Sequence, residues 1–380
     1  MTTHHPIIGF DAKRIVRNAT GLGSYGRTLV NDLSRYPIRL HLYAPDAGRA
    51  DLRQQIVEAD NVQFCYPGSF SRLLPSLWRS RGIVSDLKRH GVQVFHGLSG
   101  ELPMGIKDSG IKSVVTIHDL IFLRHPEFYN SIDVSIYTWK FRRTLQEAHH
   151  IIAISECTKR DILEFGSQWV SADDISVIYQ SCSPRFSAEA DPAHLSQVRA
   201  LYGLPQRYLL NVGSIESRKN VLLAVSALPQ LPPDVSIVIV GRRTAYTTQI
   251  ERFAAKHGLT SRVLLLHDVP DAHLPALYAG AEVFVYPSVY EGFGIPIIEA
   301  IRCGLPVVAC SGSCLEEAGG PSTIYVSPKD AGGMAHAIRR SLKGAAHREE
   351  HIAASQEYIR RFDGHDVAGQ VVDVYRQLLG

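Results

Sequence analysis

The sequence predicts an α/β protein with two domains, each built around a parallel β-sheet. Two series of short β-branched and aromatic segments alternate with helical patterns, the first within residues 1–186 and the second within residues 187–361. A strand, a helix and a following strand in this order form the repeating unit of a parallel sheet. The length of 380 residues suits two domains of ordinary size.

Six segments of each domain are expected to form strands. Those of the first domain are residues 7–11, 39–43, 92–96, 113–118, 150–155 and 175–179. Those of the second domain are residues 208–213, 235–240, 263–267, 283–286, 307–309 and 323–326. The polar residues 183–207 contain three prolines and predict a linker with a short helix. We therefore expect two Rossmann-like domains that face a central cleft, with ligands beyond the carboxyl ends of the strands.

Composition and charge exclude several classes of protein. The formal net charge is only +3, which gives no strong field for nucleic acid, and no stretch has the length of a transmembrane helix. Residues 1–6 lack the basic start and apolar core of a signal peptide. The six cysteines form no Cys-x-x-Cys pair, which indicates reduced thiols in a cytoplasm. Since no Asp-x-Asp occurs, we expect no metal and no cofactor.

The most informative stretch is residues 288–310, which predicts a glycine-rich turn, a helix and a strand. Gly292 and Gly294 let the backbone approach a ligand closely, and Pro296 favours the first turn of the helix. The free N–H groups at the start of this helix suit a diphosphate. Glu291 and Glu299 bracket the turn, and each carboxylate can accept a pair of hydrogen bonds from sugar or ribose hydroxyls.

Each of these residues also has a purely structural interpretation. Glu299 can complement the helix dipole, and the two glycines can simply form a tight turn. The combined spacing favours a ligand site. Residues 291–299 resemble the Glu-x7-Glu signature of retaining nucleotide-sugar glycosyltransferases of the two-domain GT-B type, family four. The match includes Glu-Gly-Phe-Gly-x-Pro and the following Glu-Ala-x-x-x-Gly-x-Pro-Val-Val, and the resemblance extends over nearly the whole chain.

The resemblance implies a GT-B fold. It implies an acceptor-side first domain and a nucleotide-sugar-binding second domain. It also implies that the C-terminal helix, within residues 362–380, packs back on the first domain.

Residues 21–26 read Gly-x-Gly-x-x-Gly, the dinucleotide fingerprint, and Asp46 follows at a suitable distance for a ribose contact. About ten residues separate the first strand from Gly21, however, whereas the fingerprint needs a tight turn. The stretch also resembles the Gly-x-Gly-x-Tyr loop of the family, which implies that Gly21 and Gly23 lie near the donor diphosphate. Asp11 and Arg14 precede this loop and are candidates to face the acceptor.

His118 and Asp119 follow a predicted strand, at the edge where ligands bind. Histidine can donate or accept a proton near neutral pH, but it can also simply close a hydrogen-bond network at the strand end. The match to the His-Asp-Leu of the family implies that His118 contacts the donor sugar without acting as the base.

Arg218 and Lys219 come just before a helix expected near Asn220. Arginine can bind a diphosphate in bidentate fashion and lysine as a point charge, although the two can also be a solvated charge pair. They resemble the Gly-x-x-Glu-x-Arg-Lys-Asn element of the family, in which the basic residues neutralise the departing nucleoside diphosphate. Ser214 stands where some members have a further arginine.

Other segments resemble elements of the family less closely. The resemblance assigns the backbone around Asp268 and Val269 to the nucleotide base. Gln180 and Ser181 replace a frequent Asn-Gly in the hinge. Residues 71–81 and 137–143 mix apolar or aromatic side chains with basic ones, and residues 88–90 add charge. Such segments can lie on anionic lipid, but helices with one packed face look the same.

We therefore expect a metal-independent retaining glycosyltransferase that moves a hexose to a glycan or lipid-linked acceptor in surface polysaccharide or lipopolysaccharide synthesis. The first expectation for the donor is mannose from GDP-mannose; rhamnose, glucose and N-acetylglucosamine stay open. We expect a cytoplasmic enzyme with possible peripheral contact with the inner face of the cytoplasmic membrane. The alternatives are a nicotinamide (NAD)-dependent oxidoreductase and a non-catalytic sugar-nucleotide-binding subunit.

The candidate catalytic residues are Glu291, His118, Lys219 and Arg218. The candidate donor-binding residues are Gly21, Gly23, Asp119, Ser214, Asp268, Val269, Gly292, Phe293, Gly294, Ile295 and Glu299.

Overall fold

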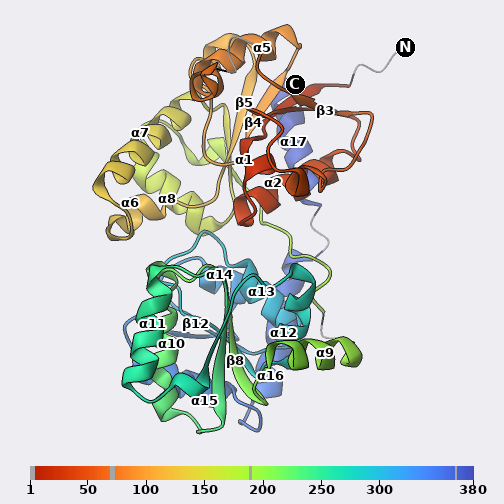
Figure 1. Cartoon of the computed structure of the whole chain (residues 1–380). Helices are drawn as coiled ribbons and strands as arrows, with labels where there is room; N and C mark the ends of the chain where they lie inside the picture. The colour runs from red at the N-terminus through yellow and green to blue at the C-terminus, as the bar shows by residue number, and fades with distance from the viewer. Residues whose placement is uncertain (1–4, 69–72, 188–190, 364–365) are drawn as a thin grey trace. The chain divides into compact units, whose positions relative to one another are not determined.

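The computed structural model describes residues 5–68, 73–187, 191–363 and 366–380 (Figure 1). The chain divides into two compact units. The first contains residues 1–180 and 366–380, and the second contains residues 181–365. Each unit is described by itself below.

The first unit is built on a seven-stranded sheet in which all neighbouring strands are parallel. Its order is β3 (Val62–Cys65), β2 (Arg39–Tyr43), β1 (Ile7–Asp11), β4 (Val94–Gly97), β5 (Lys112–Ile117), β6 (His150–Ala153) and β7 (Ile175–Val177). The order reverses between β1 and β4, which are neighbours in the sheet but not in the chain. In open parallel sheets, such a point is where ligands bind.

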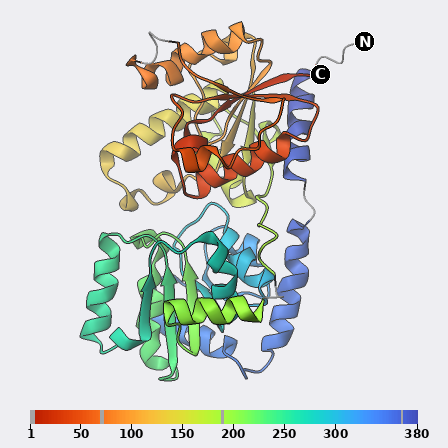
Figure 2. The ribbon, with the colours of Figure 1, turned by 45° about the vertical axis from the view of Figure 1, so that its right-hand side comes forward.

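Helices cover both faces of this sheet. They are α1 (Lys13–Arg17), α2 (Gly21–Leu33), α3 (Ala50–Arg53), α4 (Pro75–Leu77), α5 (Ile83–Arg89), α6 (Ile121–Arg124), α7 (Ser131–Glu147), α8 (Glu156–Gly166) and α17 (Val367–Leu379). The last helix, α17, lies beside α2, as both ribbon views show (Figures 1 and 2). It buries Val371 and Tyr375 in the same apolar cluster as Leu40 of β2, and the Tyr375 hydroxyl lies 2.6 Å from His96 Nδ1.

The second unit has a six-stranded sheet, again with only parallel pairs among its described strands. Its order is β10 (Val263–Leu266), β9 (Val235–Val240), β8 (Arg207–Val212), β11 (Val283–Tyr286), β12 (Val307–Cys310) and β13 (Ile324–Val326). The order reverses between β8 and β11. The strands carry almost continuous apolar runs, such as Val-Ser-Ile-Val-Ile-Val in β9, because both faces of the sheet are covered.

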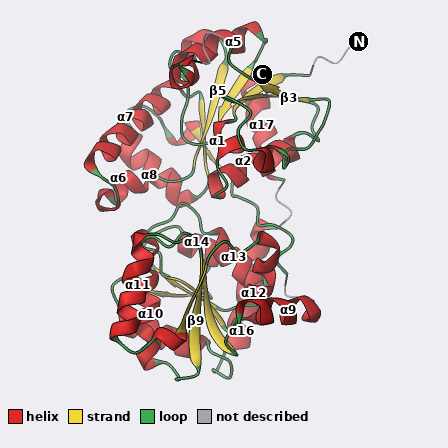
Figure 3. Ribbon diagram, in the orientation of Figure 1, coloured by secondary structure: helices red, strands yellow, loops and turns green. Residues whose placement is uncertain are grey.

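The helices of the second unit form two layers around the sheet (Figure 3). They are α9 (Pro192–Tyr202), α10 (Val221–Ala227), α11 (Ala245–Lys256), α12 (Leu274–Gly280), α13 (Ile295–Arg302), α14 (Leu315–Gly319), α15 (Ala331–Ser341) and α16 (Arg348–Ile359). Val221 of α10, Ile250 of α11 and Met334 of α15 share one buried cluster with the strands. Helices α12, α13 and α16 lie on the other side of the sheet in Figure 3.

The predicted α/β class with two parallel sheets is confirmed, and all twelve predicted strands are present. The prediction missed β3, a four-residue edge strand that carries the polar Gln63 between apolar neighbours. The structure divides the chain at residues 180 and 181 and again at residues 365 and 366, whereas the sequence suggested 186 and 187, and 361 and 362. Helix α16 and the turn Arg360–Phe362 that follows it therefore belong to the second unit.

Candidate active site

A buried carboxylate with two cations is the main feature at the switch point of the second unit. Glu291 Oε1 lies 2.5 Å from Lys219 Nζ, and Glu291 Oε2 lies 3.0 Å from Arg218 Nη1. The Glu291 residue is 8% exposed. The structure thus brings together three of the four predicted catalytic residues.

The sheet topology explains this meeting. Arg218 and Lys219 lie in the loop after β8, and Glu291 lies in the loop after β11, the neighbouring strand. The two loops are joined by their backbones, since Val289 N–H donates to Arg218 O at 3.0 Å. Lys219 Nζ also donates to the Tyr286 hydroxyl at 2.7 Å.

Electrostatics favour the charged forms of this cluster. Burial opposes ionisation of Glu291, but Lys219 and Arg218 together hold the pKa of its carboxyl below its ordinary value. Burial likewise opposes the charge on Lys219, but Glu291 and Tyr286 raise the pKa of its ammonium group overall. Two half-buried cations share one buried carboxylate. Glu216 adds a longer contact of 3.5 Å to Arg218 from a more exposed position. Such a site can accept a further anion.

The glycine-rich turn has a conformation that its sequence requires. Gly294 adopts φ 123°, a region that favours glycine, and a Cβ atom there would lie 3.2 Å from both Leu315 and Ala318. Helix α13 begins at the next residue, Ile295. The Cys314 thiol lies 2.7 Å from Phe293 O and 3.1 Å from Glu291 O, and these contacts stabilise the turn. Sequence reasoning missed Cys314, because a buried thiol some twenty residues away carries no local signal.

Glu299 lies on α13 and has a different environment from Glu291. It accepts a hydrogen bond from the Tyr278 hydroxyl at 2.9 Å. Burial raises the pKa of the Glu299 carboxyl to about 7. Among the described residues, no cation lies as close to Glu299 as Lys219 and Arg218 lie to Glu291. A carboxyl of this kind exchanges its proton near neutral pH and can accept hydroxyl hydrogen bonds when ionised.

The carboxyl ends of β8, β9 and β10 are packed tightly together. Gly213 follows β8 with φ 147°, and a Cβ on Gly241 would lie 1.9 Å from Gly213 O. His267 Nδ1–H donates to Gly241 O at 2.6 Å. Asp268 follows with φ 53°, a left-handed conformation that aspartate adopts more readily than most residues. Ser214 and Val269 are the half-buried neighbours of these turns.

His118 and Asp119 lie at the end of β5 in the first unit. His118 Nε2–H donates to Leu98 O at 2.9 Å, and His118 Nδ1 accepts from the Gln180 side chain at 3.1 Å. The Tyr25 ring contacts the imidazole edge to face, with centroids 4.8 Å apart. Burial lowers the pKa of His118 to about 4, so the ring is neutral at physiological pH. A ligand hydroxyl can bind Nδ1 only by replacing the Gln180 amide.

Gly21 and Gly23 occupy the first turn of α2. A Cβ on Gly23 would lie 1.9 Å from Asn18 O, so this glycine is needed for backbone packing, whereas Gly21 faces open space. Helix α1 separates β1 from Gly21, which differs from the tight strand-to-helix turn of a dinucleotide fingerprint. The carboxylate of Asp46 is paired with the guanidinium of Arg17.

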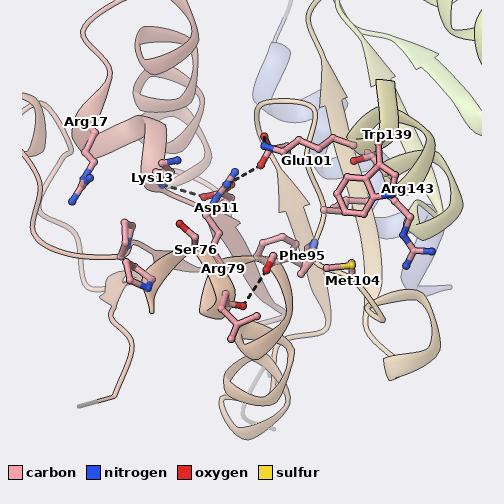
Figure 4. Close-up of a pocket in the computed structure, with 18 residues that line it drawn as sticks. Asp11, Lys13, Arg17, Ser76, Arg79, Phe95, Glu101, Met104, Trp139 and Arg143 are labelled. Carbon is pink, nitrogen blue, oxygen red and sulfur yellow. Dashed lines mark hydrogen bonds and ion pairs between the residues drawn. The ribbon is translucent and has the colours of Figure 1, made fainter. Parts of the chain in front are cut away.

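Two cavities of the first unit adjoin these residues. The smaller, of about 180 Å³, is lined by Arg14, Leu22, His118, Asp119 and Lys140 among others. The larger, of about 600 Å³, contains a charged network (Figure 4). In that network, Arg79 pairs with Asp11 at 2.6 Å and with Glu101 at 2.7 Å, and Lys140 pairs with Glu101 at 2.9 Å. The sequence suggested Asp11 as a residue that faces the acceptor. Arg79, Glu101 and Lys140 come from three separate segments, so their contacts with one another and with Asp11 could not be predicted from the sequence.

Apolar side chains are exposed around the larger cavity. Leu77 and Trp139 line it and are 58% and 54% exposed. Leu74 on the same short segment as Leu77, and Ile132 on α7, are also exposed. The sequence suggested residues 71–81, 88–90 and 137–143 as lipid-facing segments. Residues 71 and 72 of the first segment lie outside the described residues. No helix among the described residues is both long and apolar enough to cross a bilayer.

Comparisons with known proteins assign the chain to a family. Residues 19–183 match the model "Glycosyltransferase Family 4", and residues 201–358 match the model "Glycosyl transferases group 1". The chain is a glycosyltransferase. Its switch-point cluster, Arg218, Lys219 and Glu291, lies within the group 1 match, and His118 lies within the family 4 match.

The chain is similar to two curated relatives and, in its fold, to one solved structure. The O-antigen chain mannosyltransferase B of Escherichia coli is 27% identical over 94% of this chain and 96% of its own length. The serotype-specific mannosyltransferase WbdA of Escherichia coli is 26% identical over 75% of this chain, which spans only 36% of that relative. The structure of Anabaena HepE in complex with UDP and glucose has a TM-score of 0.75 and 19% identity, and the match covers 98% of this chain and 100% of HepE.

Proposed function

We propose that this glycosyltransferase transfers mannose from GDP-mannose to a glycan or lipid-linked hydroxyl with retention of the anomeric configuration. The observation that carries the proposal is the cluster of Arg218 and Lys219 around the buried Glu291 at the switch point of the second sheet. The mannose donor is favoured by the two mannosyltransferase relatives. The retaining course is favoured by the Glu-x7-Glu resemblance of residues 291–299.

Stabilisation of the leaving diphosphate supplies much of the proposed catalysis. Lys219 and Arg218 face one carboxylate from 2.5 and 3.0 Å, and an incoming diphosphate adds the second anion that two cations can hold. In this proposal these cations take the place of a metal ion. Glu291, which stays ionised beside them, orients the sugar hydroxyls.

The remaining donor contacts follow from the turns at the strand ends. Glu299 accepts hydrogen bonds from the ribose, and the backbone at Asp268 and Val269 contacts the base. The turn and helix start at Gly292, Phe293, Gly294 and Ile295 offer backbone N–H groups to the diphosphate. Ser214 lies in the same loop after β8 as Lys219. Gly21, Gly23, His118 and Asp119 of the first unit are proposed donor contacts on the strength of the family resemblance.

The acceptor is proposed to bind in the 600 Å³ cavity of the first unit. Its network of Asp11, Arg79 and Glu101 offers both donors and acceptors to sugar hydroxyls. The exposed Leu77 and Trp139 at its lining suit the apolar part of a lipid-linked glycan. We accordingly propose a cytoplasmic enzyme of surface polysaccharide or lipopolysaccharide synthesis with peripheral membrane contact.

The first experiment is thermal unfolding with GDP, UDP, dTDP and NAD in the presence of EDTA. A nucleotide that binds only the folded state raises the Tm. We expect GDP to give the largest rise, and radiolabelled GDP-mannose then to yield labelled glycan with a lipid-linked acceptor. A Tm rise with NAD alone would favour the oxidoreductase. Tight GDP-mannose binding without turnover on a panel of acceptors would favour a non-catalytic subunit.

A further inference from the structure

Three side chains with metal-binding atoms meet on the first unit's sheet, outside the two cavities described above. His41 lies on β2, Cys65 ends β3, and His90 follows the last residue of α5. One imidazole nitrogen from each histidine and the Cys65 Sγ atom all lie within 4.8 Å of one another. The lining of neither cavity includes these residues. The cluster therefore needs an explanation separate from glycosyl transfer.

The strand register places the three groups on one face of the sheet. Strands β2 and β3 are parallel, and Tyr43 pairs with Cys65. Side chains alternate between the two faces of a strand, and Leu40 and Leu42 pack into the cluster on the opposite face. His41 and Tyr43 thus face the same layer as Cys65, which α5 covers with Leu87. The sequence separations exceed twenty residues, so no short motif announces the cluster.

His41 is buried without the partners that a buried imidazole requires. The residue is 6% exposed, and neither of its ring nitrogens has a hydrogen-bond partner among the described residues. Buried polar groups are nearly always bonded, because an unpaired one loses the hydrogen bonds that water would supply. A nitrogen lone pair next to a thiol and a second imidazole is suited to a metal ion.

The other two groups have the environment of metal ligands. Cys65 is also 6% exposed, and its thiol forms no disulfide but hydrogen-bonds with the Tyr43 side chain. His90 is half-buried, which leaves a path from solvent, and its Nδ1 lies 2.8 Å from the Tyr43 hydroxyl. A ligating histidine is usually oriented by a hydrogen bond at its other ring nitrogen, and Tyr43 can supply that bond.

We propose that His41, Cys65 and His90 bind one Zn²⁺ ion. Zinc takes imidazole nitrogens at about 2.0–2.1 Å and thiolate sulfur at about 2.3 Å in a tetrahedral arrangement, so its ligand atoms lie roughly 3.3–3.8 Å apart. The atoms in the structure lie within 4.8 Å of one another, so binding requires that the three side chains move closer together by about 1 Å. Water fills the fourth position. The ion links edge strand β3 and helix α5 to β2, a structural role at the margin of the sheet.

The test uses the full chain, stripped with a chelator and then titrated with Zn²⁺ against a chromophoric indicator. We expect one equivalent of Zn²⁺ to bind with a Kd below 1 μM, on the order of other structural sites. Co²⁺ in its place is expected to give intense tetrahedral visible bands and a thiolate-to-cobalt band in the near ultraviolet. Cys65→Ser should remove the thiolate band and weaken Zn²⁺ binding at least about tenfold. Cys157→Ser changes an equally buried thiol of the same unit and should leave both unchanged.

Two results would overturn the proposal. One is a wild-type chain that binds no stoichiometric Zn²⁺ at micromolar concentration, or whose Co²⁺ spectrum lacks the thiolate band. The other is Zn²⁺ binding that survives both Cys65→Ser and His41→Gln unchanged, which would place the ion elsewhere. If the variants fail to fold, the wild-type Co²⁺ spectrum still decides.

Discussion

Both units place charged groups at the switch point of their sheets, but the ratio of cations to carboxylates differs between them. In the second unit, Lys219 and Arg218 share the buried Glu291. In the first unit, the two cations Arg79 and Lys140 meet the two carboxylates Asp11 and Glu101. Among contacts of 3.0 Å or shorter, two cations face one carboxylate in the second unit, which suits a diphosphate, and two cations face two carboxylates in the first unit, which suits neutral hydroxyls. The contrast supports the proposal that the donor belongs to the second unit and the acceptor to the first.

The largest expected effect is on the cationic cluster. Lys219→Ala should lower kcat by about 100- to 1,000-fold, because a charge that stabilises the leaving diphosphate is removed. The readout is initial-rate transfer from GDP-mannose. Arg207→Ala is the matched control, since Arg207 pairs with the buried Glu282 at the opposite end of the same strand. A Lys219 variant with near-normal kcat would contradict the role of the cluster.

A smaller effect is expected from a substitution in the first unit, which should change acceptor binding but not nucleotide binding. Arg79→Ala should raise the KM for the acceptor about tenfold and leave the Tm rise with GDP unchanged, because its partners Asp11 and Glu101 lose their organising cation. Arg124→Ala is the control, since Arg124 also bridges two carboxylates, Asp161 and Glu164, but lines neither cavity. If both variants change the acceptor KM equally, the effect is one of stability and the cavity loses its assignment.

The smallest expected effect on turnover is at Glu299, where stability changes with pH. The pKa of Glu299 rises from 4.5 to about 7 on folding, so the folded chain holds a proton that the unfolded chain releases. This contribution favours folding at low pH and is lost as pH rises through about 7. Relative to wild type, Glu299→Gln should therefore be little changed near pH 4 and up to about 3 kcal/mol more stable above pH 7.

The measurement is urea unfolding of both proteins at pH 4, 6 and 8. A difference in free energy of unfolding that does not grow with pH would show that Glu299 ionises normally. The same variant should bind GDP about tenfold more weakly, since an amide replaces a carboxylate that accepts two ribose hydroxyls.

The α/β class and nearly all strands could be predicted from the sequence alone, and so could the residues of the proposed donor site. The turn, the helix and the candidate ligand-binding groups of residues 288–310 lie in one continuous segment. The local sequence was therefore sufficient to predict Glu291 and Glu299 as candidate site residues. Arg218 and Lys219 were found in the same way, directly after a predicted strand. Their contact with Glu291 follows from adjacent strands, but only the sheet order makes β8 and β11 neighbours.

The other features depend on contacts that form only in the folded chain. The network around Arg79, the support of the turn by Cys314 and the cluster of His41, Cys65 and His90 each join segments that lie far apart in the chain. Such contacts depend on strand register and helix placement, which leave no periodic or short-range pattern in a single sequence. The protonation of Glu299 also depends on burial, a property that spacing alone does not reveal.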